Sequence, residues 1–112
     1  MQAVQEMNTY IMLVQGNPRV RKEALANHYD VSVATVSTRL KEMEKEIEKG
    51  RYPRDTIIRD GKIVWVNVLA FDDFLERRKQ LQDPIARKHT PEYNPCKKAE
   101  SWGWNYRALK NY

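Results

Sequence analysis

Residues 23–40 read EALANHYDVSVATVSTRL, and this stretch decides the fold. Its first part predicts a short helix over 21–29 with three inward-facing side chains: Leu25, Ala26 and Tyr29. Ser32 is a good N-cap for a second helix, because its hydroxyl can accept from a free backbone N–H of the first turn. This helix is predicted over 33–49 by an apolar stripe with steps of four, three and four: Val36, Leu40, Met43 and Ile47. Gly50 is its expected stop.

A β-hairpin is predicted after the second helix. Two β-branched and aromatic runs, Thr56–Arg59 and Lys62–Val66, are separated by Asp60-Gly61. Two residues of this kind form the preferred type I′ loop, since both central positions need positive φ. Asn67 can cap a final helix over 68–82. At the start of the chain, a further amphipathic helix is predicted over 3–15 by Val4, Met7, Ile11 and Val14.

The run Leu-Ala, Val-Ser, Thr-Val-Ser and Leu within residues 25–40 resembles, at the family spacing, the helix-turn-helix of bacterial repressors and winged-helix regulators. Asp30 stands where that family usually has glycine, and Asp tolerates the left-handed conformation better than most residues. The order of elements over roughly residues 20–82 is similar to that of excisionases and small phage proteins. The resemblance implies a mostly α fold with a β-hairpin wing, an α+β winged helix-turn-helix. A two-helix corner in an unrelated core is the alternative.

The resemblance also implies which side chains read DNA. Val31 would fill the space under the turn, while Val36 and Leu40 would pack the second helix on the first. Small side chains near the start of that helix would then face outward, where they can reach base edges in a major groove. With Lys41 as the last position facing DNA, the expected contacts are Ser32, Val33, Ala34, Thr35, Ser37, Thr38 and Lys41. Ser and Thr can bond to phosphates or bases, and Val or Ala can contact a thymine methyl.

Two groups of charged residues, on the hairpin and in the second half of the long helix, bear on this interpretation. As part of a wing, Arg54, Arg59 and Lys62 would be phosphate contacts, whereas on a solvated hairpin edge they would only discourage pairing with other strands. The second half of the long helix alternates lysines with four glutamates: Glu42, Glu44, Glu46 and Glu48. Phosphate would repel these acids, so this half is expected to be a solvated face with i,i+4 ion pairs.

The chain divides into a DNA-binding domain over 1–83 and a basic aromatic tail over 84–112. The net charge is +5, and the tail, with 6 Lys/Arg against 2 Asp/Glu, supplies +4 of it. Cations interleaved with rings could hold phosphates and stack on bases. The candidate tail contacts are Lys97, Lys98, Trp102, Trp104 and Arg107. Packing of the rings onto the domain, or binding of a protein partner, is favoured over this interpretation.

Other function classes find little support in the 112 residues. Two histidines and one cysteine give no metal-ligand spacing, and the adjacent Asp72 and Asp73 should point to different faces of a helix. We therefore expect no enzyme, no cofactor and no metal. Cys96 alone excludes an internal disulfide and suits a reducing cytoplasm. The longest apolar run, 63–71, is too short to span a bilayer, and no secretory signal is recognisable, so no membrane partner is expected.

The expected function is sequence-specific binding of double-stranded DNA. The chain would act as an excisionase-like or architectural factor, or as a transcription regulator, of a phage or mobile element. It could bind DNA as a homodimer or a cooperative assembly, and the tail could hold a protein partner. The alternative function is a small phage-type interaction module that binds a host or regulatory protein instead of DNA.

Overall fold

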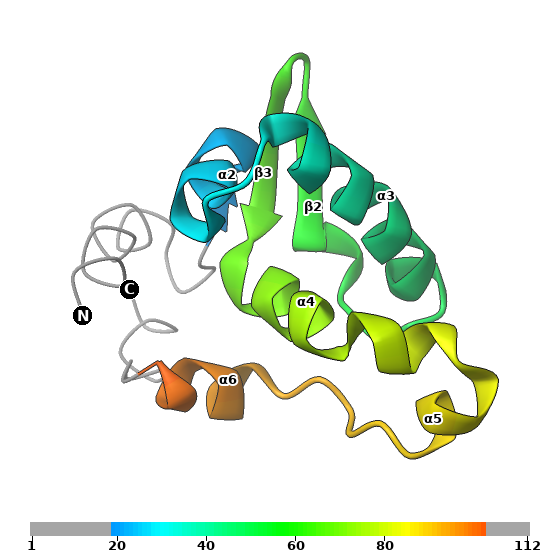
Figure 1. The fold of residues 1–112 in the computed structure, drawn as a ribbon. Coiled ribbons are helices and arrows are strands. Elements are labelled where there is room, and N and C mark those ends of the chain that lie inside the picture. The colour runs from blue at the N-terminus through cyan, green and yellow to red at the C-terminus, as the bar shows by residue number, and fades with distance from the viewer. Residues whose placement is uncertain (1–18, 103–112) are drawn as a thin grey trace.

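The computed structural model describes residues 19–102 and shows an α+β fold that is mostly helical (Figure 1). Its helices are α2 (Lys22–Tyr29), α3 (Val33–Glu48), the 3-10 helix η1 (Arg54–Thr56), α4 (Val68–Gln82), α5 (Pro84–Lys88) and α6 (Pro95–Ser101). Its strands are β1 (Arg19–Arg21), β2 (Ile57–Asp60) and β3 (Ile63–Asn67). The α+β class expected from the sequence is confirmed. The helix predicted over 3–15 lies outside the described residues.

The strands form an antiparallel sheet in the order β1-β3-β2. Val20 on β1 pairs with Val66 on β3, and both are buried on the face that meets the helices. Because side chains alternate along a strand, the opposite face carries the pair Ile58 and Trp65. Those two side chains are exposed. The sheet therefore has one covered and one open face.

The hairpin turn differs from the prediction. Asp60 pairs with Ile63, so the two turn residues are Gly61 and Lys62 and not Asp60 and Gly61. Within residues 19–102, the only non-glycine with positive φ is Asp30, so Gly61 is the one turn residue with positive φ, at 58°. A type I′ turn needs positive φ at both central positions, whereas a glycine at the first alone fits type II′. The predicted turn was therefore wrong by one residue and by type.

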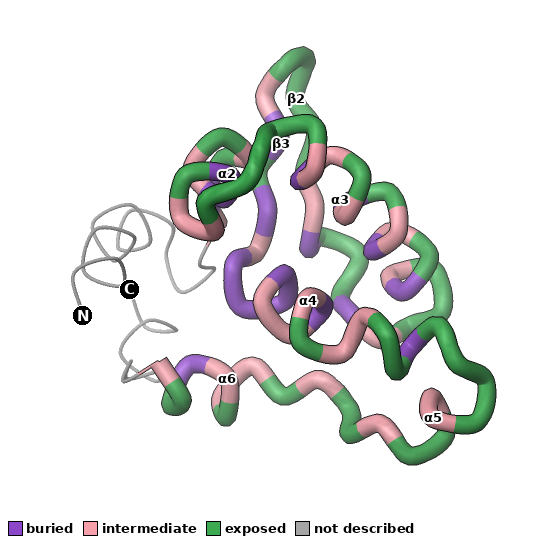
Figure 2. Tube along the Cα trace, viewed as in Figure 1, coloured by how far each residue is buried: buried purple, intermediate pink, exposed green. Residues whose placement is uncertain are grey.

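The core lies where α2, α3 and α4 meet the sheet, as the buried segments in Figure 2 show. The expected inward residues Leu25 and Ala26 are buried, and Tyr29 packs against the same cluster. The predicted stripe of α3 is confirmed at three buried positions and one that packs on the core: Val36, Leu40, Met43 and Ile47. These side chains orient α3 and leave the opposite side of its first turns exposed.

Local capping explains where the helices begin and end. The Ser32 hydroxyl accepts from the Thr35 N–H at 3.0 Å, and the Asn67 side chain accepts from two N–H groups of α4, which confirms both predicted caps. Asp30 ends α2 in the left-handed conformation, with φ 55°. Val31 does not fill the space under the turn as expected, because 42% of its surface is exposed. Its backbone N–H bonds to the Ala26 carbonyl, and its side chain is not part of the core cluster.

The segment after α4 contains two short helices that its sequence did not predict. Each begins with a proline after a capping side chain, Asp83 for α5 and Asn94 for α6. Ala99 of α6 is fully buried, and Tyr93 and Trp102 pack against the core. The expectation that rings of the tail fold back onto the domain is thus confirmed for these two.

Candidate nucleic-acid interface

The first turns of α3 form an open surface made of residues singled out from the sequence. Here Ser32, Val33, Ala34, Thr38 and Lys41 are exposed. Thr35 and Ser37 are half-buried, so neither the core nor the described part of the tail encloses them. No acidic residue occurs over 31–41. Below this surface, the buried stripe of α3 holds the helix against the core.

The hydroxyl groups of this surface are partly engaged within the helix. Ser32 Oγ caps α3 and lies 2.9 Å from Thr35 Oγ1. Thr38 Oγ1 donates to the Ala34 carbonyl at 3.1 Å, so it retains only acceptor capacity. Beside them, 39% of the surface of Val33 is exposed. The surface can therefore accept hydrogen bonds and make apolar contacts, which are the interactions available to a thymine-bearing base pair.

The acidic half of α3 differs from the expected solvated face with i,i+4 pairs. Glu42 accepts from Arg78 of α4 at 2.6 Å and from Arg39 at 2.7 Å, at a spacing of i,i+3. The hydrogen bond from Arg78 is the main reason why the pKa of Glu42 lies below its ordinary value. Glu44 pairs with Arg59 of β2 at 2.6 Å.

Glu46 is the most buried of these acids, with 5% of its surface exposed. It pairs with Arg87 of α5 at 2.8 Å, and this contact raises the pKa of Arg87. The prediction failed because these partners come from elements 15 to 41 residues away, where helical spacing carries no information. As a result, arginines neutralise three of the four glutamates.

The cations assigned to the hairpin do not gather in one place. Lys62 is exposed in the turn, at the tip. Arg59 is half-exposed, and its guanidinium is engaged by Glu44 of α3. Arg54 lies on η1, before the first residue of β2, and is therefore at the opposite end of the hairpin. Only Lys62 is placed at the tip as a wing contact would be.

The outer face of the hairpin carries two residues that the sequence analysis did not single out. Ile58 and Trp65 lie opposite each other on β2 and β3, and 37% and 36% of their surfaces are exposed. Arg21 of β1 lies opposite Trp65 on the other side. Only β3 alternates between buried and exposed positions, and its residues are nearly all apolar, so the sequence carried no signal for this exposed pair.

The described candidates of the tail lie beside α4, away from the first turns of α3 (Figure 1). Lys97 is exposed on α6, whereas the ammonium of Lys98 lies 2.6 Å from both Asp72 and Glu76. The Trp102 indole donates to Asp72 at 3.3 Å. Lys98 and Trp102 thus hold α6 on α4. The two remaining candidates, Trp104 and Arg107, lie outside the described residues.

The adjacent carboxylates Asp72 and Asp73 of α4 each accept a hydrogen bond from a tyrosine of another segment. The Tyr29 hydroxyl donates to Asp72 at 2.7 Å, and the Tyr52 hydroxyl donates to Asp73 at 2.6 Å. Burial, together with these carboxylates, raises the pKa of both tyrosines above the ordinary range. Arg51 adds an ion pair to Asp73 at 2.9 Å. The two acids therefore point to different sides, as expected, and both are engaged in packing.

The described residues contain neither a metal-ligand cluster nor a membrane-spanning helix. Across residues 19–102, no three or more His, Cys, Asp or Glu side chains are grouped so that they could hold a metal ion. None of the described helices combines the length and apolar character needed to cross a membrane. No protein-family model, curated protein or solved structure matches this chain.

Proposed function

We propose that the chain is a winged helix-turn-helix protein that binds double-stranded DNA in a sequence-specific manner. The first turns of α3 would enter the major groove, α2 would brace against the backbone, and the β2–β3 hairpin would be the wing. The order of α2, a three-residue turn, α3 and the hairpin supports this arrangement. So does the basic character of the chain, with a net charge of +5.

One observation carries the proposal: α3 is open and free of acids at its start, and its acidic end is neutralised by arginines. An uncompensated carboxylate near DNA would be repelled by phosphate. Here Arg78, Arg59 and Arg87 each engage a different glutamate of α3. A helix built in this way can approach DNA with its first turns at a reduced electrostatic penalty from its second half, where only Glu48 is not paired with an arginine within the described residues.

The biological role that best fits the sequence resemblance is a cytoplasmic excisionase-like or architectural factor, or a transcription regulator, of a phage or mobile element. The two roles predict different DNA sites. A directionality factor would bind repeated sites cooperatively and bend the duplex, whereas a repressor would bind a palindrome as a dimer. Selection of binding sites from random duplexes separates the two, because the selected sequences give symmetry and spacing together.

Salt dependence of binding to the selected duplex tests DNA binding itself. Log affinity should fall linearly with log salt, with a slope of about −0.9 for each phosphate contact. Lys41→Gln should reduce the slope by about one contact. Lys79→Gln, which removes an exposed lysine of α4, is the matched control and should leave the slope unchanged. Flat, negligible binding to every duplex would contradict the proposal.

A second candidate function is a protein-interaction module, and the exposed Ile58–Trp65 pair favours it. Apolar residues exposed together on a sheet face are suited to a protein surface. If this face holds a partner, Trp65→Ser should abolish partner binding while leaving duplex affinity intact. If the hairpin serves only DNA, the same substitution should affect no protein contact.

A further inference from the structure

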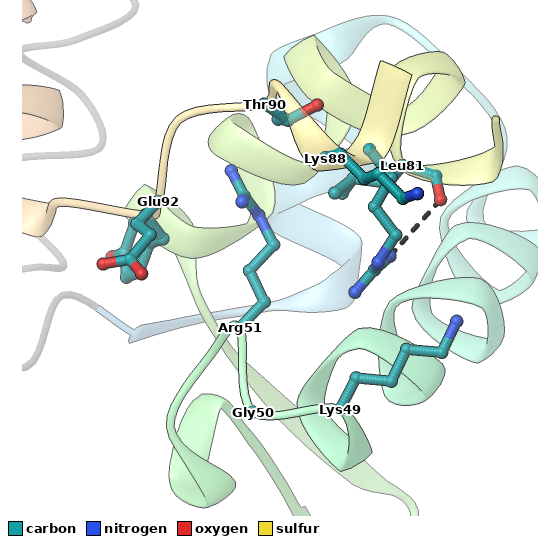
Figure 3. A pocket seen from close by; sticks show the side chains of 9 residues that line it. Lys49, Gly50, Arg51, Leu81, Lys88, Thr90 and Glu92 are labelled. Carbon is teal, nitrogen blue, oxygen red and sulfur yellow. Dashed lines mark hydrogen bonds between the residues drawn. The ribbon is translucent and has the colours of Figure 1, made fainter. Parts of the chain in front are cut away.

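A cleft lies at the end of α3 opposite to the proposed DNA-reading surface (Figure 3). It opens between the segment after α3, the helix α5 and the segment that follows α5. Its volume is about 640 Å³, and its lining includes four cations: Lys49, Arg51, Arg87 and Lys88. A helix of 16 residues is about 24 Å long, so this cleft and the first turn of α3 are separate surfaces.

Hydrogen bonds to neighbouring protein groups fix the side chains of Arg51 and Arg87. Arg51 donates to Tyr52 and Asp73, and its guanidinium carbon lies 5.5 Å from the centre of the Tyr52 ring. Arg87 donates to Glu46 and to the Leu81 carbonyl, the contact drawn in Figure 3. Both side chains are therefore ordered before any ligand arrives, which lowers the entropic cost of binding.

Each of these guanidinium groups keeps free donors. Within the described residues, Nη1 of Arg51 and both Nε and Nη2 of Arg87 have no hydrogen-bond partner. None of these atoms is among the buried polar atoms that lack a partner, so each has some contact with solvent, more for Arg87, whose side chain is 31% exposed, than for Arg51, at 9%. Because a guanidinium is planar and presents several N–H groups, such free edges suit the oxygens of a phosphate.

The two lysines stand at the more open part of the cleft. The side chain of Lys49 is 57% exposed and 4.0 Å from Glu46, and Lys88 is exposed without an ion pair in the described structure. Of the nearby carboxylates, the Glu46 side chain is only 7% exposed against 31% for Arg87, so Glu46 lies behind that arginine, and Asp73, 13% exposed, is paired with Arg51. Glu92 is the one acid of the lining.

Arg87 keeps its charge through its own carboxylate partner. The hydrogen bond to Glu46, together with the charge of Glu46, raises the pKa of Arg87 by more than burial and the charge of Arg51 lower it. Four cations face three carboxylates, two of which are nearly buried. An anion in the cleft would be attracted by the exposed lysines and by the exposed part of Arg87.

We propose that this cleft binds a phosphate group, carried either by a free phosphate compound or by a nucleic-acid backbone. The cleft is within the size range of small-molecule sites, so it can hold a phosphate with a substituent. The proposal does not depend on DNA reading by α3, since the residues concerned lie at the other end of that helix.

Titration of the full chain with inorganic phosphate, at constant ionic strength against chloride, tests the site. The readout is the NMR signal of the Nε–H groups of Arg51 and Arg87. Saturating shifts are expected for both. The double variant Lys49→Gln/Lys88→Gln changes only exposed side chains and should weaken phosphate binding about tenfold or more, through loss of two charge-assisted contacts. Lys97→Gln removes an exposed lysine on α6 and should leave binding unchanged.

A second arm identifies the source of the phosphate. If the double variant also loses affinity for duplex DNA, and duplex competes with inorganic phosphate, the group belongs to a nucleic-acid backbone. If duplex affinity is unchanged while phosphate binding falls, the ligand is a free phosphate compound. Shifts that do not saturate, or that chloride reproduces, would overturn the proposal. Equal phosphate affinity in the parent and the double variant would overturn it as well.

Discussion

Asp30 shows how one backbone angle limits the stability of the α2–α3 turn. Its φ of 55° is left-handed, a conformation that glycine adopts without steric cost and Asp with some. We predict that Asp30→Gly raises the free energy of unfolding by about 0.5 kcal/mol, and that Asp30→Val lowers it by at least about 1 kcal/mol, because a β-branched side chain is strained there. Denaturant unfolding measures both. A loss of stability in the glycine variant would show that the Asp side chain itself supports the turn.

Val33 is the residue through which the proposed interface could distinguish bases. The neighbouring hydroxyls of Ser32 and Thr38 are engaged within α3, while Val33 is open to contact with a thymine methyl. Replacing thymine by deoxyuridine in a selected duplex removes only that methyl, and should weaken binding by about 1 kcal/mol or more. Val33→Ser should bind both duplexes equally. Equal binding of both by the parent protein would mean that Val33 reads no methyl group.

At the scale of elements, Glu42 joins α3 to α4. Its contact with Arg78 lowers its pKa below the ordinary value of 4.5. A carboxyl whose pKa is lowered on folding stabilises the protein above its unfolded pKa, and this contribution is lost as the pH falls through the folded value. Stability should therefore decline below about pH 4.5.

Glu42→Gln should remove part of this acid dependence and should cost about 1 kcal/mol at neutral pH. Glu48→Gln is the matched control, since Glu48 is exposed on the same helix. Chemical unfolding at a series of pH values measures both variants. The ion pair would be shown to contribute nothing if Glu42→Gln and the parent had the same pH profile.

The helices and strands that the sequence predicted are those determined by residues close to them in the sequence. Ser32 and Asn67 cap helices through residues two or three positions away, so their role is visible in the sequence. α5 and α6 were missed because five and seven residues are too few to show a helical period.

The candidate surface, too, was predictable only where it depends on local sequence. Its small, acid-free start is a property of local sequence. The engagement of Arg59 by Glu44, and of Lys98 by two acids of α4, depends on tertiary contacts. The exposure of Val31 depends on how the turn packs against the rest of the molecule, which a residue pattern does not specify.

At the scale of the whole molecule, the sequence boundary at residue 83 does not coincide with the edge of the core. Ala99 is fully buried, and Lys98 and Trp102 contact α4. A chain that ends at Gln82 should therefore lose about 2 kcal/mol or more of stability, by exposing apolar surface on α4. Thermal unfolding measures the loss. Ala99→Asp in the full chain should act in the same direction, and unchanged melting of both would show that α6 adds nothing to the core.

Neighbouring side chains on a helix diverge by about 100°, which lets Asp72 and Asp73 serve different parts of the protein. Asp72 accepts hydrogen bonds from Tyr29 of α2 and from Trp102, which follows α6, and it forms an ion pair with Lys98 of α6. Lys98 is thus the counter-ion of the carboxylate to which α2 is tethered. If α6 dissociated from α4, Asp72 would lose its counter-ion and its negative charge would be uncompensated. A change in α6 would therefore alter the electrostatic environment of Tyr29 and α2.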